Sequence, residues 1–156
     1  MKKNTLMSIT GLAMLILFSI TSVKATAGVP SKFQGHPAYL RALSDLRAAR
    51  WMLDHRPGNW KQTEDEIGAV REIDKAIFEL KQAAIDDGKD INFHPRVDER
   101  PDRPGRLHAA ADYLRKARAD VNEEEDNQFA KGLKHRALEH INMAVGSTER
   151  AIANKM

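Results

Sequence analysis

The sequence LRAAR at residues 46–50 returns 68 residues later as LRKAR at residues 114–118. The same offset superposes two sets of apolar residues further along the chain. Ala69, Ile73, Ala76 and Ala83 fall on Ala137, Ile141, Ala144 and Ala151. Two segments in each half therefore keep one register without an insertion. The repeated unit is a helical hairpin, and two tandem hairpins predict an all-α, antiparallel four-helix bundle.

Apolar residues at spacings of three and four predict a helix in each of four segments. The first hairpin covers about residues 36–88, and its first helix starts near Pro37, which suits the first helical position. Thr63 and Glu66 have the spacing of a capping box, which predicts the start of the second helix. We expect Gly88 to end that helix in a left-handed conformation.

The second hairpin covers about residues 106–154, and the proline-rich residues 89–105 form the connector. We expect its second helix to begin near Asp126-Asn127, because either side chain can cap it. Gly146, inside that helix, is expected to let a neighbouring helix approach. Short links within hairpins favour antiparallel neighbours, so the sequence predicts an up-down-up-down order. The residues expected to close the ends of the alanine-rich core are Trp51, Trp60, Phe78 and Phe93.

Residues 1–27 have the pattern of a secretory signal peptide. Lys2 and Lys3 precede an apolar run from Leu6 to Ile20, which is shorter than the about 20 residues of a membrane-spanning helix. We expect cleavage before Gly28, which leaves residues 28–156 as one bundle domain in the bacterial periplasm or outside the cell. An uncleaved N-terminal anchor is the alternative. No second apolar run follows, so no membrane contact is expected after cleavage.

Cleavage changes the charge balance of the chain. The full sequence has 25 Lys and Arg against 22 Asp and Glu, but three of the lysines lie in residues 1–27 and no acid does. The remaining chain carries 22 of each, so it lacks the positive excess that nucleic-acid binding needs. It also has no cysteine, which excludes disulfides, thiolate nucleophiles and thiolate metal ligands.

Histidine and carboxylate side chains offer one candidate metal site. In the up-down-up-down order the first and third helices begin at the same end of the bundle, so we expect His36, His94 and His108 to lie at that end, beside Asp86 and Asp87. Imidazole and carboxylate groups suit zinc, copper or nickel. Asp86 and Asp87 also oppose the helix dipole at the end of the second helix, and the charges expected to offset them are Lys89, Arg103, Arg106 or a bound cation. The alternative is that these histidines are cap and surface residues.

Sequence signatures of enzymes are absent. The chain has no Glu-x-x-His pair for a di-iron centre, no His-Glu-x-x-His, no phosphate-binding glycine loop and no Gly-x-Ser-x-Gly. The sequence therefore predicts a non-catalytic protein with no required cofactor.

The pattern HPAYLRALSDLRAAR at residues 36–50, with the hairpin duplicated behind a signal peptide, resembles uncharacterised secreted bacterial helical-hairpin proteins. Its layout over about residues 36–154 also resembles the small metal-binding proteins of the periplasm. That resemblance implies a four-helix bundle of histidine-bearing hairpins that collects divalent metals, with His36, His94 and His108 as the matching set. We therefore expect an exported helical protein that binds an unknown protein or envelope partner. Divalent-metal binding or buffering is the alternative, and the oligomeric state is left open.

Overall fold

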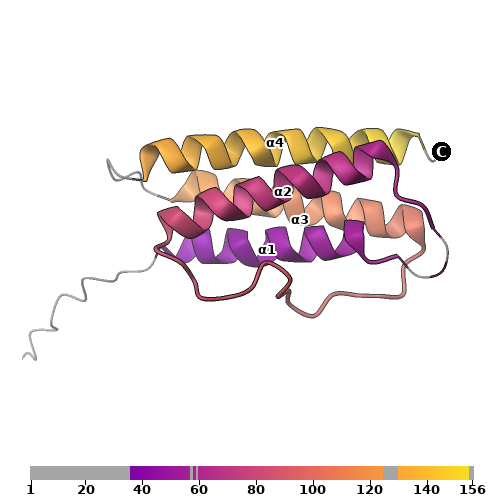
Figure 1. Cartoon of the computed structure of the whole chain (residues 1–156), viewed down its shortest axis with the longest axis horizontal. Helices are drawn as coiled ribbons and strands as arrows, with labels where there is room; N and C mark the ends of the chain where they lie inside the picture. The colour runs from indigo at the N-terminus through magenta and orange to yellow at the C-terminus, as the bar shows by residue number, and fades with distance from the viewer. Residues whose placement is uncertain (1–35, 57, 59, 125–129, 155–156) are drawn as a thin grey trace, which may run out of the picture. The chain divides into compact units, whose positions relative to one another are not determined.

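A computed structural model describes residues 36–56, 58, 60–124 and 130–154 of the chain. They belong to one compact unit, Phe33–Met156. Four helices account for most of them, and the described residues include no strand. The helices are α1 (Pro37–Asp54), α2 (Glu64–Ala83), α3 (Arg103–Glu123) and α4 (Lys131–Ala153) (Figure 1). The prediction of an all-α bundle is confirmed.

The first two helices begin where their sequence signals predict. Pro37 is the first residue of α1 and follows the N-cap His36. Thr63 caps α2 by accepting a hydrogen bond from the Glu66 amide, while the Thr63 amide donates to the Glu66 carboxylate at 2.6 Å. This capping box satisfies two backbone N–H groups that have no partner inside the helix.

The end of α2 differs from the prediction at Gly88. The helix ends at Ala83, and the chain turns at Ile85 and Asp86, whose φ angles are 57° and 44°. The Asp86 amide donates to the Lys81 carbonyl and the Ile85 amide to that of Gln82, which is the pattern of a Schellman cap. Ile85 thus takes the left-handed position that glycine usually occupies, and Gly88 lies in the turn beyond it.

The start of α4 also differs from the prediction. The helix begins at Lys131 with Ala130 as its N-cap, and no side chain caps it. Asp126 and Asn127, the expected caps, lie outside the described residues.

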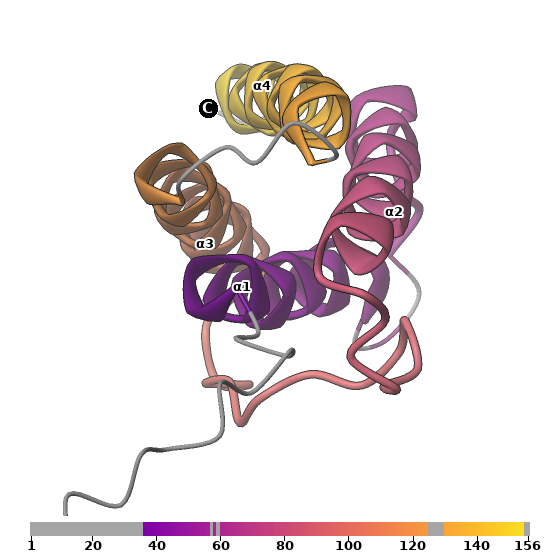
Figure 2. The ribbon, with the colours of Figure 1, turned by 90° about the vertical axis from the view of Figure 1, so that its left-hand side faces the viewer.

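Each helix packs against two neighbours in the order α1, α2, α4, α3 around the bundle (Figure 2). The Ala38 amide at the start of α1 donates to Glu124, which caps the end of α3. Asp65 near the start of α2 likewise accepts from Arg150 near the end of α4. Neighbouring helices from different hairpins are therefore antiparallel, like the two helices within each hairpin.

The predicted up-down-up-down order is wrong. Arg103, the first residue of α3, hydrogen-bonds Glu66 in the first turn of α2, so these two helices start at the same end. The order is up-down-down-up, and residues 84–102 run beside α1 from one end of the bundle to the other (Figure 1). Their 19 residues easily span the about 30 Å length of a helix such as α2.

The two hairpins use equivalent positions of the repeat in the same way. Leu46 and Leu114 are fully buried, as are Ile73 and Ile141. Polar contacts between helices also recur. Arg50 donates to Asp74 at 2.7 Å, and the equivalent Arg118 donates to Asn142 at 3.4 Å. The inner faces of the hairpins are therefore built on one pattern.

Candidate functional site

His36 lies at the end of the bundle where α1 begins and α3 ends. Its Nδ1 is 3.0 Å from a carboxylate oxygen of Glu124, and its ring packs against Tyr39. The second oxygen of Glu124 accepts the amide of Ala38, so Glu124 joins α3 to the first turn of α1. His36 thus takes part in helix-end contacts between the hairpins.

His94 and His108 lie towards the opposite end. His94 packs against Trp51 near the end of α1, with ring centroids 5.0 Å apart, and His108 is exposed in the second turn of α3. His55, at the end of α1, stacks on the same Trp51 with ring centroids 4.4 Å apart. The expected gathering of His36, His94 and His108 is wrong, because α1 and α3 begin at opposite ends.

Trp51 also contacts a buried cation. The guanidinium of Arg106 lies 4.8 Å from the Trp51 ring, and Arg106 is only 2% exposed. Burial lowers the pKa of Arg106, against the smaller opposing effect of Glu99. Cation–π contact is favourable when the cation is desolvated. His55, His94 and Arg106 therefore surround an aromatic side chain that holds the connector against the bundle.

Asp86 and Asp87 obtain their cations from this chain. Asp87 accepts two hydrogen bonds from Arg47, at 2.7 and 3.0 Å, and both side chains are almost fully buried. Burial alone raises the pKa of Asp87, but hydrogen bonds from Arg47 and the Lys89 amide outweigh it and hold the pKa below its usual value. Asp86 pairs with Lys81 at 3.2 Å. These contacts fasten the connector to α1.

The described part of the chain contains no group of three or more histidine, aspartate or glutamate side chains placed to hold a metal ion. Of the five residues expected to form a metal site, Asp86 and Asp87 are adjacent in the sequence, and each is paired with a cation. Metal binding by this chain stays a prediction that the arrangement of these five residues does not support.

A groove of about 570 Å³ lies between α2 and α4. Gly68 of α2 and Gly146 of α4 both line it. An added Cβ would lie 3.8 Å from Ser147 Oγ at Gly68 and 3.6 Å from Arg150 Nη1 at Gly146, which are ordinary contacts. Helix packing therefore leaves room for alanine at both positions. The expected close approach of a neighbouring helix does not explain why residue 146 is glycine.

Large apolar side chains stand exposed beside this groove. Met143, which lines it, is 48% exposed, and Phe78 is 60% exposed in an adjoining hollow of about 580 Å³ that also includes His140. Phe78 does not close the end of the core as expected. Phe93, also expected there, is likewise exposed. An exposed apolar group beside a hollow is a common feature of interaction surfaces.

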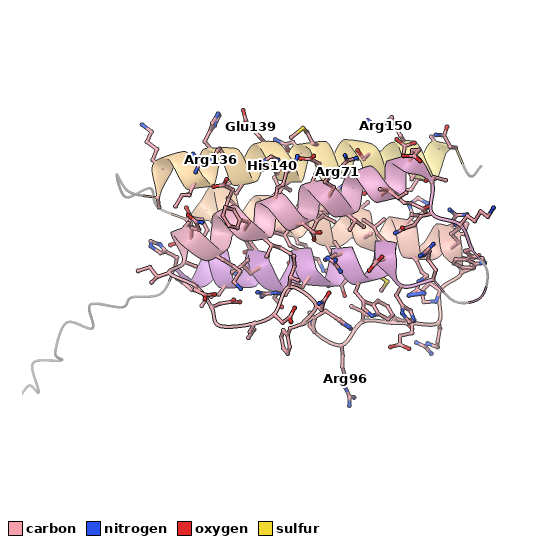
Figure 3. The ribbon with its side chains drawn as sticks, in the orientation of Figure 1. Arg71, Arg96, Arg136, Glu139, His140 and Arg150 are labelled. Atoms are coloured by element: carbon pink, nitrogen blue, oxygen red, sulfur yellow. The ribbon has the colours of Figure 1, made fainter. Side chains whose placement is uncertain are left out.

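Arg71 lines both hollows and is exposed on α2 (Figure 3). Among the residues that the structure describes, it forms no hydrogen bond or ion pair. The residues four positions away on α2 are Ile67 and Lys75, and Asp74, three positions on, is held by Arg50. Arg71 is therefore a cation without an ion-pair partner among the described residues.

His140 crosses from α4 to α2 at the centre of this face. Its Nδ1 is 2.7 Å from Glu72, which also accepts from Lys75 at 2.8 Å. Burial raises the pKa of Glu72, but its hydrogen bonds to Lys75 and His140 outweigh burial and hold the pKa below its usual value. His140 thus joins the two hairpins.

The sequence contains a signal for this surface. The exposed positions of α2 follow one another at spacings of three and four: Glu64, Ile67, Arg71, Lys75, Phe78 and Gln82. Two of these six are large and apolar, although they lie on the face opposite the core stripe. A helix with large apolar residues on its solvent face has more apolar surface than the bundle core uses, which is typical of an interaction surface.

Comparisons with known protein families, with characterised proteins and with solved structures find no match to this chain. Among the residues described, no helix combines the length and the apolar character needed to cross a bilayer.

Proposed function

We propose that this chain is an exported, non-catalytic helical protein that binds a protein partner through the groove between α2 and α4. The observation that carries the proposal is the groove itself. It has glycines on both walls, an unpaired cation at Arg71 and an exposed apolar group at Met143, and Phe78 is exposed in the adjoining hollow. Hydrophobic groups flanked by a charge fit a protein partner better than a small polar ligand.

The glycines support this proposal on energetic grounds. A glycine inside a helix is less favourable than alanine by about 0.5–1 kcal/mol. Neither Gly68 nor Gly146 has a left-handed φ, and both have space for a Cβ. Packing therefore does not explain why glycine stands at these positions in place of the more favourable alanine. A groove that must stay open to a partner does explain it.

The ionisable groups of the groove support a non-catalytic role. Glu72 is held by His140 and Lys75, and its lowered pKa keeps it charged at neutral pH. Asp65 is held by Arg150 at 3.0 Å. A general acid or base works best with a pKa near the operating pH. Export is supported by the signal-like pattern of residues 1–27.

A photo-crosslinking amino acid at Phe78 tests the proposal in cells that export the protein. Leu40, which is 43% exposed on α1, is the matched control because it is another exposed apolar side chain outside the groove. We expect a discrete crosslinked product from Phe78 that Arg71→Glu reduces and that Leu40 does not give. Equal labelling from both positions would contradict the proposal.

The sequence-based alternative, a divalent-metal protein, has its own test. Zinc, copper or nickel would raise the melting temperature of the wild type at neutral pH if the folded chain bound them. A rise that is lost when His36, His94 and His108 are all replaced by alanine would support that alternative, despite the separation of these residues.

A further inference from the structure

We propose that the partner at this groove is a second copy of the chain, bound antiparallel through α2. The inference rests on the proposed function, because it names the occupant of the same groove. Its starting observation is a pair of opposite charges on the outer face of α2. Glu64 and Arg71 are both exposed, both line the groove, and neither forms an ion pair with a residue that the structure describes.

The spacing of these two charges makes the surface self-complementary. Glu64 and Arg71 are seven residues apart, which is two helical turns, so they lie on one stripe of α2. When two such helices pack antiparallel across a twofold axis, residue i of one copy faces residue j of the other and the reverse. An axis midway between the two charges places each Arg71 opposite the Glu64 of the other copy.

The residues at that midpoint suit a helix contact. Ile67 and Gly68 lie at the centre, and Ile67 is 40% exposed although it is large and apolar. Gly68 has no side chain, so a second helix can approach the wall of the groove there. Met143 of α4 also lines this groove and adds apolar surface beside the centre. Two apolar groups flanked by two reciprocal ion pairs form an isologous contact with a hydrophobic centre and a charged rim.

The cations near Arg71 do not compete for this role. Arg150, which also lines the groove, is held by Asp65 and Ser147, and Lys75 of the adjoining hollow is held by Glu72. Charge repulsion across the axis is therefore small, and Arg71 is the cation left for the partner. Because complementary charges set register and orientation, reversing one of them should disrupt the dimer and reversing both should restore it.

Sedimentation of the purified chain tests this pairing. We expect wild type to form dimers in the micromolar range, and Arg71→Glu or Glu64→Arg to weaken them at least tenfold. The double variant, with both charges reversed, should return to within about threefold of wild type. Arg96→Glu is the control, because Arg96 is also exposed and projects away from the bundle on the connector (Figure 3). A monomer at all concentrations, or a double variant that stays monomeric and folded, overturns the proposal.

The absence of cysteine allows a second test that does not depend on charge. Ile67→Cys places a thiol next to the twofold axis, and mild oxidation should join two chains rapidly. Arg96→Cys should react far more slowly, and equal rates would overturn the inference. A photo-crosslinking amino acid at Met143, which lines the groove, separates the two proposals. A product of twice the chain mass supports the dimer, whereas a product of any other mass supports the interaction protein and rejects the second copy.

Discussion

Arg47 in the first hairpin and Arg115 in the second occupy equivalent positions of the repeat but have opposite surroundings. The Arg47 side chain is 1% exposed and holds Asp87 of the connector, whereas that of Arg115 is 46% exposed and pairs with Asp112 and Glu149. Two other equivalent pairs differ in the same sense. Ala48 is buried where Lys116 is exposed, and Trp51 packs against the connector where Ala119 is exposed.

This difference separates the faces of the repeat that form the shared core from the face that contacts the connector. The faces that pair the hairpins agree at buried positions such as Leu46 and Leu114. The hairpins differ where the connector lies on α1, because the connector covers this outer face of α1 and leaves the equivalent face of α3 exposed. A buried arginine in one hairpin and an exposed arginine in the other are therefore consequences of a single covering segment.

The largest expected effect concerns the buried ion pair. Asp87→Ala leaves Arg47 buried without its carboxylate, and loss of one partner of such a pair costs about 3–5 kcal/mol. Glu149→Ala, which removes a partner of the equivalent Arg115, should change the unfolding free energy by less than about 1 kcal/mol because both groups are exposed. Chemical denaturation measures both changes. Similar losses of unfolding free energy would contradict the difference between the two hairpins.

The next effect concerns the shared core. Leu46→Ala and Leu114→Ala should each lower the unfolding free energy by about 2–4 kcal/mol, because both leucines are fully buried. Each variant should unfold in one cooperative transition. A nearly silent substitution at either leucine, or two separate transitions, would show that the hairpins do not share one core.

A smaller effect concerns acid. Hydrogen bonds from Arg103 and the Thr63 backbone outweigh burial and hold the pKa of Glu66 below its usual value. The stability that Glu66 adds is therefore complete above the unfolded pKa of about 4.3 and is lost as the pH falls through the folded value. The difference in unfolding free energy between wild type and Glu66→Gln should narrow as the pH falls below about 5. The smaller difference in unfolding free energy between wild type and Glu149→Gln, in the second hairpin, serves as the control. A difference between wild type and Glu66→Gln that does not change with pH would contradict the assignment.

The smallest effect concerns the helix ends. Ile85 ends α2 at a φ of 57°, a conformation that is strained for a β-branched residue, and its side chain is 67% exposed. Ile85→Gly should raise the unfolding free energy by about 0.5–1 kcal/mol, because relief of strain exceeds the added entropy of the unfolded chain. Asn154, which ends α4 at a φ of −76°, should give no gain when changed to glycine. A thermal melt of each variant distinguishes them.

The groove was only partly visible in the sequence. The two apolar residues on the outer stripe of α2, Ile67 and Phe78, indicate an unusual surface, and their exposure agrees with that periodicity. The association of Gly68 and Arg71 of α2 with Met143 and Gly146 of α4 could not be read from either segment alone, because it depends on how the second hairpin packs against the first. For the same reason, the pairing of Glu72 with His140 was not predicted.

Local sequence determined the four helices, the capping box at Thr63 and the buried positions of the repeat, because helix periodicity and capping act over a few residues. The tertiary structure alone decided that the connector runs the length of α1, since a link of 19 residues can return the chain to either end of the bundle. That choice reversed α3 relative to the expected order. It separated His36 from His94 and His108, and it gave Asp87 an arginine as its partner.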